Sequence, residues 1–451
     1  MAKYKAYPEY KDSGVESLDT IPKMWSIKKV KYIFEINKRI AGKLGFDVLS
    51  VTQKGIKIKD IESGEGQLSM DYSKYQRVYP GEFAMNHMDL LTGYVDISNY
   101  DGVTSPDYRV FAVRDKHSFY SRYYLYLLQD GYKQRRFFHL GQGSAHLGRW
   151  RLPTEAFNEI VYPCPSMKEQ IHIASFLDHE TAKIDNLIEK QQQLIELLKE
   201  KRQAVISHAV TKGLNLDVPM KDSGVEWLGE VPEHWVGSSL KYMAKVIDCK
   251  HITAEFSDIG IPVASISEVK SWFVDLSTAK LTTEKDYLLL IDGGRKPVCG
   301  DIIYSRNATV GEAAIVSDNM PDFAMGQDVC LIKTNQKVIP EFILYTLKSD
   351  IIAQQLNLAM IGSTFKRINV DDIRNFSIAI PPKNEQVLIV KTLMGKLEKY
   401  DRIISNAVDV ITYMQERRTA LISAAVTGKI DVRDWVDPDT QDVEESQEAT
   451  A

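Results

Sequence analysis

The stretch KDSGVESLDTIPKMW (Lys11–Trp25) decides how this chain is built, because it occurs twice. It returns as KDSGVEWLGEVPEHW (Lys221–Trp235), and eleven of the twenty-two positions from Lys11 to Tyr32 are identical in the second copy. A second match pairs LKEKRQAVISHAVTKG (Leu198–Gly213) with MQERRTALISAAVTGK (Met414–Lys429), with eight of sixteen positions identical. Such self-similarity indicates two copies of one structural unit.

Two shorter anchors lie between these matches and keep the same order in each half. One is the pair Gly143-Ser144 and Gly362-Ser363, and the other is the transition Pro165…Glu169-Gln170 and Pro381…Glu385-Gln386. Each half therefore has a KDSGVE entry, a variable body, a GS turn, a Pro/EQ transition and a long helix. The predicted domains are a first body (1–165), a helix (166–213), a second body (214–381), a helix (382–430) and a tail (431–451).

The two bodies are predicted to be mixed α/β. They hold short β-prone runs separated by Gly, Pro and Asn, and one clear helix each, Ser121–Leu128 and Glu341–Leu347. The β-prone runs are Phe46–Val51, Tyr108–Val113, Ile261–Ile266 and Val329–Ile332.

The segment Met167–Lys212 contains no Gly or Pro, and apolar residues recur along it at heptad spacing, as they do 216 residues later. This pattern predicts two long helices that pack against each other along one seam. An arginine stands at the same register in both. The seam residues, which we also expect to serve partner binding, are Leu177, Ile184, Ile188, Ile195, Leu198, Arg202, Leu393, Tyr400, Ile404, Ile411, Met414 and Arg418.

Antiparallel pairing of these helices would relate the two halves by a pseudo-twofold axis. At ~1.5 Å per residue the helix would be about 69 Å long, roughly the length of 20 base pairs. We therefore expect two bodies separated by a stiff spacer, and we expect the spacer to set the distance between two half-sites on one DNA duplex. A heptad deleted from one helix should then change the preferred spacing.

The overall charge points away from DNA until its distribution is considered. The chain has 56 basic and 61 acidic residues, a net charge of −5. Seven of the acids lie between Asp434 and Ala451, where no base stands, and this composition predicts a disordered tail. Without them, 56 basic residues face 54 acidic ones.

No apolar run is long enough for a membrane span, and the first residues lack the apolar core of a signal peptide. The four cysteines are scattered, which is typical of a reducing compartment, and we expect a cytoplasmic protein without a metal site.

Basic and amide side chains gather at matching points of the two bodies, around the GS turns and after the strand-like runs GEFAM and GDIIY. Arg, Lys, Asn and Gln are the residues that read base edges or neutralise phosphates. The candidate DNA-contacting residues are Lys54, Lys57, Asn86, Arg135, Arg136, Gln142, Ser144, Arg149, Arg151, Ser305, Arg306, Asn307, Ser363, Thr364, Lys366 and Arg367.

Catalytic motifs are missing. There is no GxxxxGK[ST] phosphate loop, no Asn/Asp-Pro-Pro-aromatic tetrapeptide of an amino-methyltransferase, and no HExxH spacing. One alternative stays open: Asp258, Glu268 and Lys270 are spaced loosely like the site of a metal-dependent nuclease.

KDSGVEWLGEVPEHW, the segment GEFAMNHMDLLTG with GVTSPDYRVF, the PxxxEQ transitions and the ending RRTALISAAVTGK resemble the specificity subunit of type I restriction–modification systems. The resemblance covers nearly the whole chain except the acidic tail. It implies two target-recognition domains, each reading one half of a bipartite double-stranded DNA site, joined by helices that dock two methyltransferase subunits, with restriction subunits joining them.

By the same resemblance, S-adenosylmethionine, Mg²⁺ and ATP belong to those partners, and this chain binds no cofactor and has no catalytic residue. The alternatives are a stand-alone DNA endonuclease, which would cut DNA without partners, and a solitary repressor, which would not co-purify with a methyltransferase.

Overall fold

The computed structural model describes residues 4–15, 18–63, 69–143, 150–360 and 367–436. The chain divides into two compact units, and neither follows the linear boundaries expected from the sequence. Unit 1 comprises residues 1–191 and 409–451, and unit 2 comprises residues 192–408. Each unit therefore contains one body and one half of each long helix.

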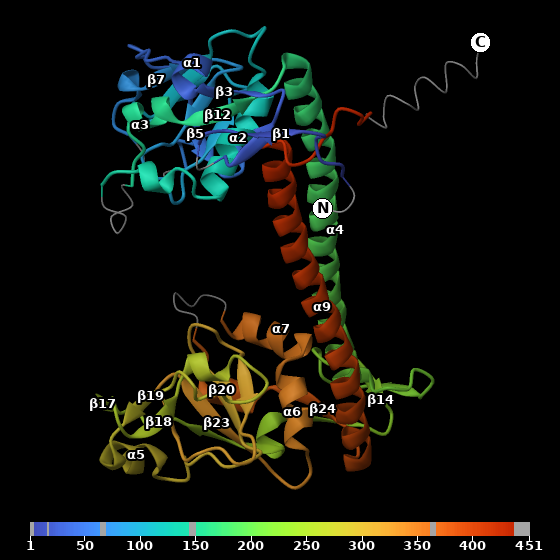
Figure 1. Cartoon of the computed structure of the whole chain (residues 1–451). Coiled ribbons are helices and arrows are strands. Elements are labelled where there is room, and N and C mark those ends of the chain that lie inside the picture. Colours follow the sequence, from blue (N-terminus) through green and yellow to red (C-terminus); the bar gives the residue numbers. More distant parts are fainter. Residues whose placement is uncertain (1–3, 16–17, 64–68, 144–149, 361–366, 437–451) are drawn as a thin grey trace, which may run out of the picture. The chain divides into compact units, whose positions relative to one another are not determined.

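Unit 1 contains two four-stranded sheets (Figure 1). One has the order β6-β5-β10-β7, with bounds Gly55–Ile58, Asp47–Thr52, Gly102–Thr104 and Gln76–Val78. The other has the order β4-β11-β8-β9, with bounds Phe34–Ile36, Arg109–Val113, Phe83–Met85 and Val95–Ile97. The helices of this body are α1 (Val30–Ile33), α2 (Ser121–Lys133) and α3 (Thr154–Glu159). The core runs through both sheets and includes Phe83, Phe111 and the aromatic face of α2.

Unit 2 repeats this plan. Its first sheet has the order β16-β23-β20-β21, with bounds Ala244–Asp248, Val329–Thr334, Ile302–Ser305 and Ala313–Ile315. Its second has the order β17-β19-β18-β22, with bounds Phe256–Ser257, Lys280–Thr282, Ile261–Ala264 and Ala324–Met325. The helices are α5 (Glu284–Ile291), α6 (Pro340–Leu347), α7 (Asp350–Ala359) and α8 (Val370–Arg374). The predicted α/β bodies and the helices at 121–128 and 341–347 are confirmed.

The described part of the repeated motif, KDSGV, has the same backbone arrangement in both units. It joins β1 (Tyr10–Asp12) to β2 (Thr20–Pro22) in unit 1 and β13 (Met220–Asp222) to β14 (Glu230–Pro232) in unit 2, in matching antiparallel registers. The Asp12 carboxylate accepts from the Gly14 amide at 2.8 Å, and Gly14 has φ of 69°. The left-handed backbone explains the glycine of the motif.

The tryptophan of each copy is buried against the Pro/EQ transition. Trp25 Nε1 donates to Glu169 Oε1 at 3.1 Å in unit 1, and Trp235 Nε1 donates to Glu385 Oε2 at 3.1 Å in unit 2. The neighbouring glutamine is fully buried: Gln170 Nε2 donates to the carbonyls of Ser118 and Pro165, and its Oε1 accepts from the Tyr120 amide. Gln386 makes the equivalent three bonds in unit 2. The repeated EQ pair thus fastens each long helix to its own body.

Short strand pairs complete the attachment of the bodies. β3 (Ser26–Lys29) pairs with β12 (Val161–Cys164), and β15 (Val236–Ser239) pairs with β24 (Ser377–Ile380), so the entry of each half runs beside its own exit.

The two long helices are α4 (Met167–Lys212) and α9 (Lys383–Val426), within one residue of the prediction for α4 at each end. In unit 1 the first half of α4 packs beside the last half of α9, where Arg418 Nε lies 2.9 Å from Asp185 Oδ1. In unit 2 the last half of α4 packs beside the first half of α9, where Arg202 Nε donates to Asp401 Oδ1 at 2.8 Å. Within each unit the helix segments therefore run antiparallel.

The expected disorder from residue 431 onward is wrong for the first residues of the tail. The Asp431 amide donates to the Lys5 carbonyl at 2.8 Å, Val432 is buried, and the Trp435 ring lies against Phe176. Apolar side chains in this short stretch bury against unit 1, which the acidic composition did not reveal. The acids from 437 onward lie outside the described residues. None of the helices that the structure describes is apolar enough over sufficient length to cross a membrane.

Candidate nucleic-acid interface

In unit 1, candidate DNA-contacting residues meet beyond the carboxyl end of β8, an interior strand of its sheet. We call this end of the strands the edge of the unit. Gln142 and Arg151 form an isolated antiparallel bridge, with amide-to-carbonyl bonds of 2.8 and 3.0 Å in both directions. The next residue, Leu152, donates its amide to the His87 carbonyl at 2.8 Å. Gln142 and Arg151 are both exposed. The bridge thus presents Arg151 beside Asn86 and His87.

Unit 2 builds the same edge beyond the end of β20. Asn307 and Arg367 form an antiparallel bridge, and the Ile368 amide donates to the Arg306 carbonyl at 3.0 Å. Arg367 is exposed, like Arg151. Arg151 and Arg367 are therefore equivalent: each lies in an isolated bridge, and the amide of the residue that follows it donates to a carbonyl just beyond β8 or β20. Ser144, Arg149, Ser363, Thr364 and Lys366, which the sequence also nominated, lie outside the described residues.

The remaining basic candidates of unit 1 lie elsewhere. Lys54 and Lys57 are exposed on the β5–β6 hairpin. Arg135 is exposed in the turn after α2, where its φ is 53°. Arg136 is half-buried: its Nη2 lies 3.1 Å from Asp130 Oδ2 and donates to Ser423 Oγ on α9. Arg136 is thus engaged inside unit 1.

Two candidates of unit 2 point inward. Ser305 is 0% exposed and Arg306 is 3% exposed. The Arg306 guanidinium is paired with Asp248, so neither side chain offers a surface to DNA in this conformation. The prediction that these two side chains contact DNA directly therefore does not fit this structure. The sequence could not show this, because a strand end alternates between both faces and only the neighbouring strands decide which face is covered.

His87, which the sequence analysis did not nominate, lies at this edge of unit 1. Burial and the guanidiniums of Arg109 and Arg151 lower the pKa of His87 from 6.5 to about 4, so its imidazole is neutral at pH 7. Among the described residues, neither His87 Nδ1 nor Asn86 Oδ1 has a hydrogen-bond partner, although both atoms are buried. The sequence signal that could have identified His87 is its position directly after Asn86, at the end of the strand-like run GEFAM.

The predicted seam residues are all buried or half-buried along α4 and α9, so they hold the helices to each other and to the bodies. Their expected second role in partner binding stays a prediction. Other apolar residues stay exposed on the helices, in pairs 216 residues apart: Leu187 with Ile403, Leu194 with Val410, and Leu197 with Tyr413. Unit 1 carries Leu187, Val410 and Tyr413, and unit 2 carries the equivalent Ile403, Leu194 and Leu197.

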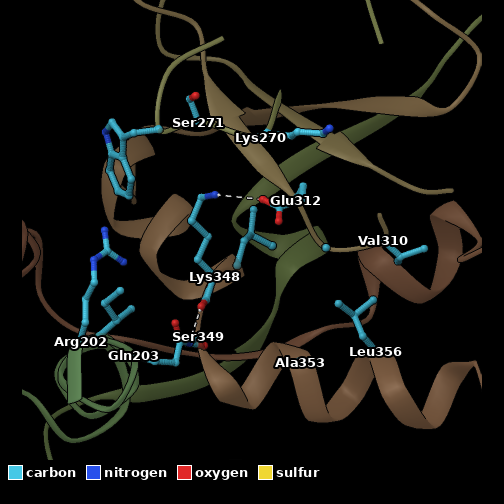
Figure 2. A pocket seen from close by; sticks show the side chains of 14 residues that line it. Arg202, Gln203, Lys270, Ser271, Val310, Glu312, Lys348, Ser349, Ala353 and Leu356 are labelled. Carbon is cyan, nitrogen blue, oxygen red and sulfur yellow. Dashed lines mark hydrogen bonds and ion pairs between the residues drawn. The ribbon is translucent and has the colours of Figure 1, made fainter. Parts of the chain in front are cut away.

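The three residues of the nuclease alternative do not form one site. Glu268 is buried and caps a 3₁₀ turn (Ile266–Val269), accepting from the Ser265 amide at 2.8 Å. Lys270 lines a cavity of about 440 Å³ in unit 2 together with Arg202, Lys348 and Glu312, and neither Asp258 nor Glu268 is among its lining residues (Figure 2). Glu268 therefore has a structural role that explains its presence.

One cluster in unit 2 has donors that a metal could use. The donor atoms of Asp248, Cys249 and His251 lie within 4.8 Å of one another, and no other such group occurs in the described part of the chain. Burial and the neighbouring Asp248 raise the pKa of Cys249 to about 11, so the thiol is protonated, and Sγ donates to the Gln327 carbonyl at 3.0 Å. The Arg306 guanidinium supplies a positive charge at 2.9 Å from Asp248. The carboxylate of this cluster is therefore paired with Arg306.

Comparison with known proteins matches the family described as "Type I restriction modification DNA specificity domain" twice, at residues 22–197 and 232–407. These two matches cover most of the chain. The chain belongs to this family. The resemblance seen in the repeated motifs is thereby confirmed, and the chain is a DNA-specificity component rather than a nuclease or a repressor.

Individual relatives agree with this membership. A putative type I restriction enzyme MjaX specificity subunit from Methanocaldococcus jannaschii is 22% identical, over 94% of this chain and 98% of its own length. The EcoBI specificity subunit from Escherichia coli is 23% identical, over 67% of each chain. In fold, the specificity chain is similar to the HsdS subunit from Thermoanaerobacter tengcongensis, with 14% identity, a TM-score of 0.51 and coverage of 91% of this chain and 98% of that one. A chain from a type I restriction–modification assembly gives a TM-score of 0.69 with 12% identity, covering 91% and 99%.

Proposed function

We propose that each unit of this specificity chain reads one half of a bipartite double-stranded DNA site. The observation that carries the proposal is the repeated edge, where the Gln142–Arg151 and Asn307–Arg367 bridges present equivalent exposed arginines. Arginine can bond two acceptors of a guanine in the major groove or neutralise a phosphate. Two equivalent edges in one chain suit a target with two parts.

We assign Arg151, Gln142 and Asn86 of unit 1 to the first half-site. We assign Arg367 and Asn307 of unit 2 to the second half-site. Lys54, Lys57 and Arg135 are assigned to the DNA backbone, because exposed lysines and arginines on hairpins and turns suit phosphates without sequence preference. The spacing between the half-sites is proposed to depend on α4 and α9, and a heptad deletion in one of them tests this.

The same proposal includes two methyltransferase subunits, joined by restriction subunits. It is supported by the equivalent exposed apolar sets, Leu187, Val410 and Tyr413 in unit 1 and Ile403, Leu194 and Leu197 in unit 2. Helix faces that expose large apolar side chains suit protein partners, and one set per unit suits two copies of the same partner. S-adenosylmethionine, Mg²⁺ and ATP are assigned to those partners, and the complex to the cytoplasm.

The decisive experiment is to map methylated adenines across the genome with and without this gene. We expect one bipartite motif to lose methylation when the gene is removed, which returns both half-sites and their spacing. Unchanged methylation in a strain that carries the methyltransferase would contradict the proposal.

A further inference from the structure

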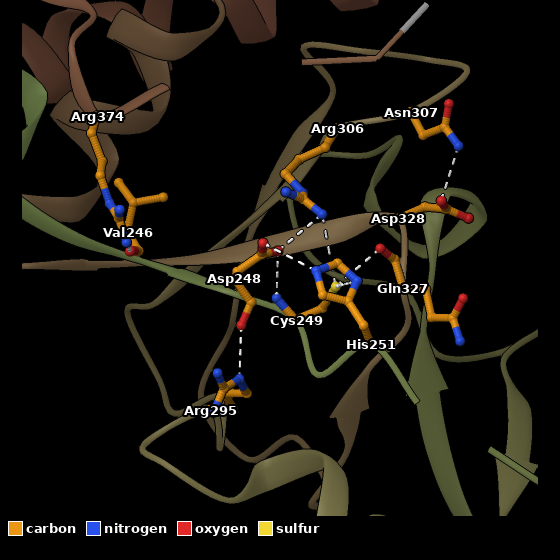
Figure 3. Close-up of polar contacts among 10 residues, drawn as sticks. All are labelled: Val246, Asp248, Cys249, His251, Arg295, Arg306, Asn307, Gln327, Asp328 and Arg374. Atoms are coloured by element: carbon orange, nitrogen blue, oxygen red, sulfur yellow. Dashed lines mark hydrogen bonds and ion pairs between the residues drawn. The ribbon is translucent and has the colours of Figure 1, made fainter. Parts of the chain in front are cut away.

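Arg306 is a buried arginine beside the DNA-facing edge of unit 2, and its side chain points away from that edge (Figure 3). Its Nη2 lies 2.9 Å from Asp248 Oδ1, at the end of β16, and 3.8 Å from Cys249 Sγ. No hydrogen-bond partner for its Nε occurs among the described residues. The guanidinium is thus anchored deep in the unit by one carboxylate.

The backbone of Arg306 is the junction from which the edge is built. Its amide donates to the Asp328 carbonyl at 2.8 Å, and its carbonyl accepts from the Ile368 amide at 3.0 Å. The next residue, Asn307, donates from Nδ2 to Asp328 Oδ1 at 3.0 Å and bridges Arg367. Anchoring the Arg306 side chain therefore fixes the backbone that positions Asn307 and Arg367.

In unit 1 a buried arginine from another strand, β11, contacts the segment that follows Arg151. Arg109 opens β11 and is 4% exposed, and its Nη2 donates to the Leu152 carbonyl at 3.1 Å and lies 3.3 Å from Thr154 Oγ1. Its guanidinium lies 4.4 Å from the centroid of the Phe157 ring. Leu152 directly follows the exposed Arg151, so Arg109 holds the backbone next to that residue.

Neither arrangement is the most favourable way to fill a core. Burying a guanidinium costs desolvation that a paired charge offsets only in part, and an apolar residue of similar volume is often neutral or stabilising in its place. Arg306 has a buried Nε without a partner, and Arg109 has no ion pair among the described residues. The presence of these two buried arginines is best explained by the backbone arrangement that they stabilise.

We propose that Arg109 and Arg306 are positioning residues for DNA recognition, Arg109 for the half-site read beside Arg151 and Arg306 for the half-site read beside Arg367. They act without touching DNA, by holding the backbone of the two edges in the arrangement that aligns exposed side chains with base edges. This inference rests on the proposed reading of two half-sites.

The test uses the full chain with Arg306→Met and, separately, Arg109→Met. Binding is measured to a duplex carrying the mapped site and to duplexes in which one half-site is scrambled. The half-site read by unit 2 is first identified as the one at which Arg367→Ala weakens binding. For Arg306→Met we expect the preference for the intact over the scrambled form of that half-site to fall about tenfold, the size of one lost base contact. Discrimination at the other half-site and the salt dependence of binding should stay as in the parent chain. For Arg109→Met we expect the same loss at the half-site read by unit 1 and no change at the half-site read by unit 2.

Arg374→Met is the matched control. Arg374 Nη2 donates to the Val246 carbonyl at 2.9 Å on the same strand as Asp248, but Figure 3 places it away from Asn307. Discrimination should not change in this variant. If Arg306→Met does not fold, Asp248→Asn decides, because it removes the charge pair and keeps the shape; a loss confined to the second half-site supports the proposal.

Equal loss at both half-sites, or unchanged discrimination, would overturn the inference about these arginines. A parent chain that does not distinguish the mapped site from scrambled DNA would instead overturn the proposed function, so the two failures are separable.

Discussion

Arg202 of α4 donates to Asp401 of α9 at 2.8 Å, and the contact of Arg418 with Asp185 repeats it 216 residues away at 2.9 Å. Each arginine occupies a seam position where a heptad pattern expects an apolar residue. A single polar residue at such a position specifies which register two helices adopt. The repeated pair therefore fixes the same helix alignment in both units.

The Arg202–Asp401 pair should contribute more to register than to stability. Both side chains are partly exposed, at 33% and 55%, so we expect Asp401→Ala to lower the free energy of unfolding by only about 0.2–1 kcal/mol. A double-mutant cycle of Arg202→Ala with Asp401→Ala, followed by denaturant unfolding, measures the coupling. Glu416→Ala, in the other unit, should be additive with Arg202→Ala; an equal coupling there would refute the pairing.

Arg151→Ala and Arg367→Ala should each weaken recognition at one half-site only. The loss should be about tenfold in affinity, and it should be confined to duplexes that keep the corresponding half-site. Competition binding with duplexes carrying one intact half-site measures this. If Arg367→Ala leaves binding at both half-sites intact, the assignment of that edge is wrong.

Gln170→Ala should destabilise unit 1 by about 2–4 kcal/mol, because two carbonyls and one amide lose their partner in a buried place. Gln386→Ala should do the same in unit 2. Hydrogen exchange of the amides in each body reports the two effects separately. Equal deprotection of both bodies by Gln170→Ala would contradict the independence of the two attachments.

His87 predicts a dependence of stability on pH. Its folded pKa of about 4 lies below the unfolded value of 6.5, so the unfolded chain binds more protons between these values. The stabilisation is present above pH 6.5 and is lost as the pH falls toward 4, and between pH 7 and pH 5 the loss is about 2 kcal/mol. Denaturant unfolding of the parent chain and of His87→Gln at both pH values tests this, since the variant should lose that part of the slope. An identical slope would mean that His87 is not buried in its neutral form.

Tyr413→Glu and Leu197→Glu should each remove one methyltransferase from the complex. Tyr413 is 69% exposed and Leu197 is 54% exposed, so a charge at either place should not disturb the fold but should oppose an apolar contact. The mass of the assembled complex should fall by one methyltransferase subunit in each single variant and by two in the double variant. Glu416→Gln, an exposed change on the same helix, serves as the control and should keep both.

The sequence by itself determined the features that depend on order along the chain. The repeat set the two bodies, and the glycine- and proline-free heptads set α4 to within one residue at each end. The helix could be predicted because helical periodicity acts over a few neighbours, and the bodies because the same segments occur twice along the chain. The charge of the tail explained why the overall −5 does not exclude DNA.

Tertiary structure decided which side of each element faces inward. Arg306 and Arg367 look alike in the sequence, yet Asp248, which lies far away in the chain, draws one into the core and leaves the other exposed. Heptad spacing, by contrast, had already separated Ile188, which lies against the core, from the adjacent Leu187, which is exposed. Burial depends on which distant segments cover a residue, and this information is not carried by its neighbours in the sequence.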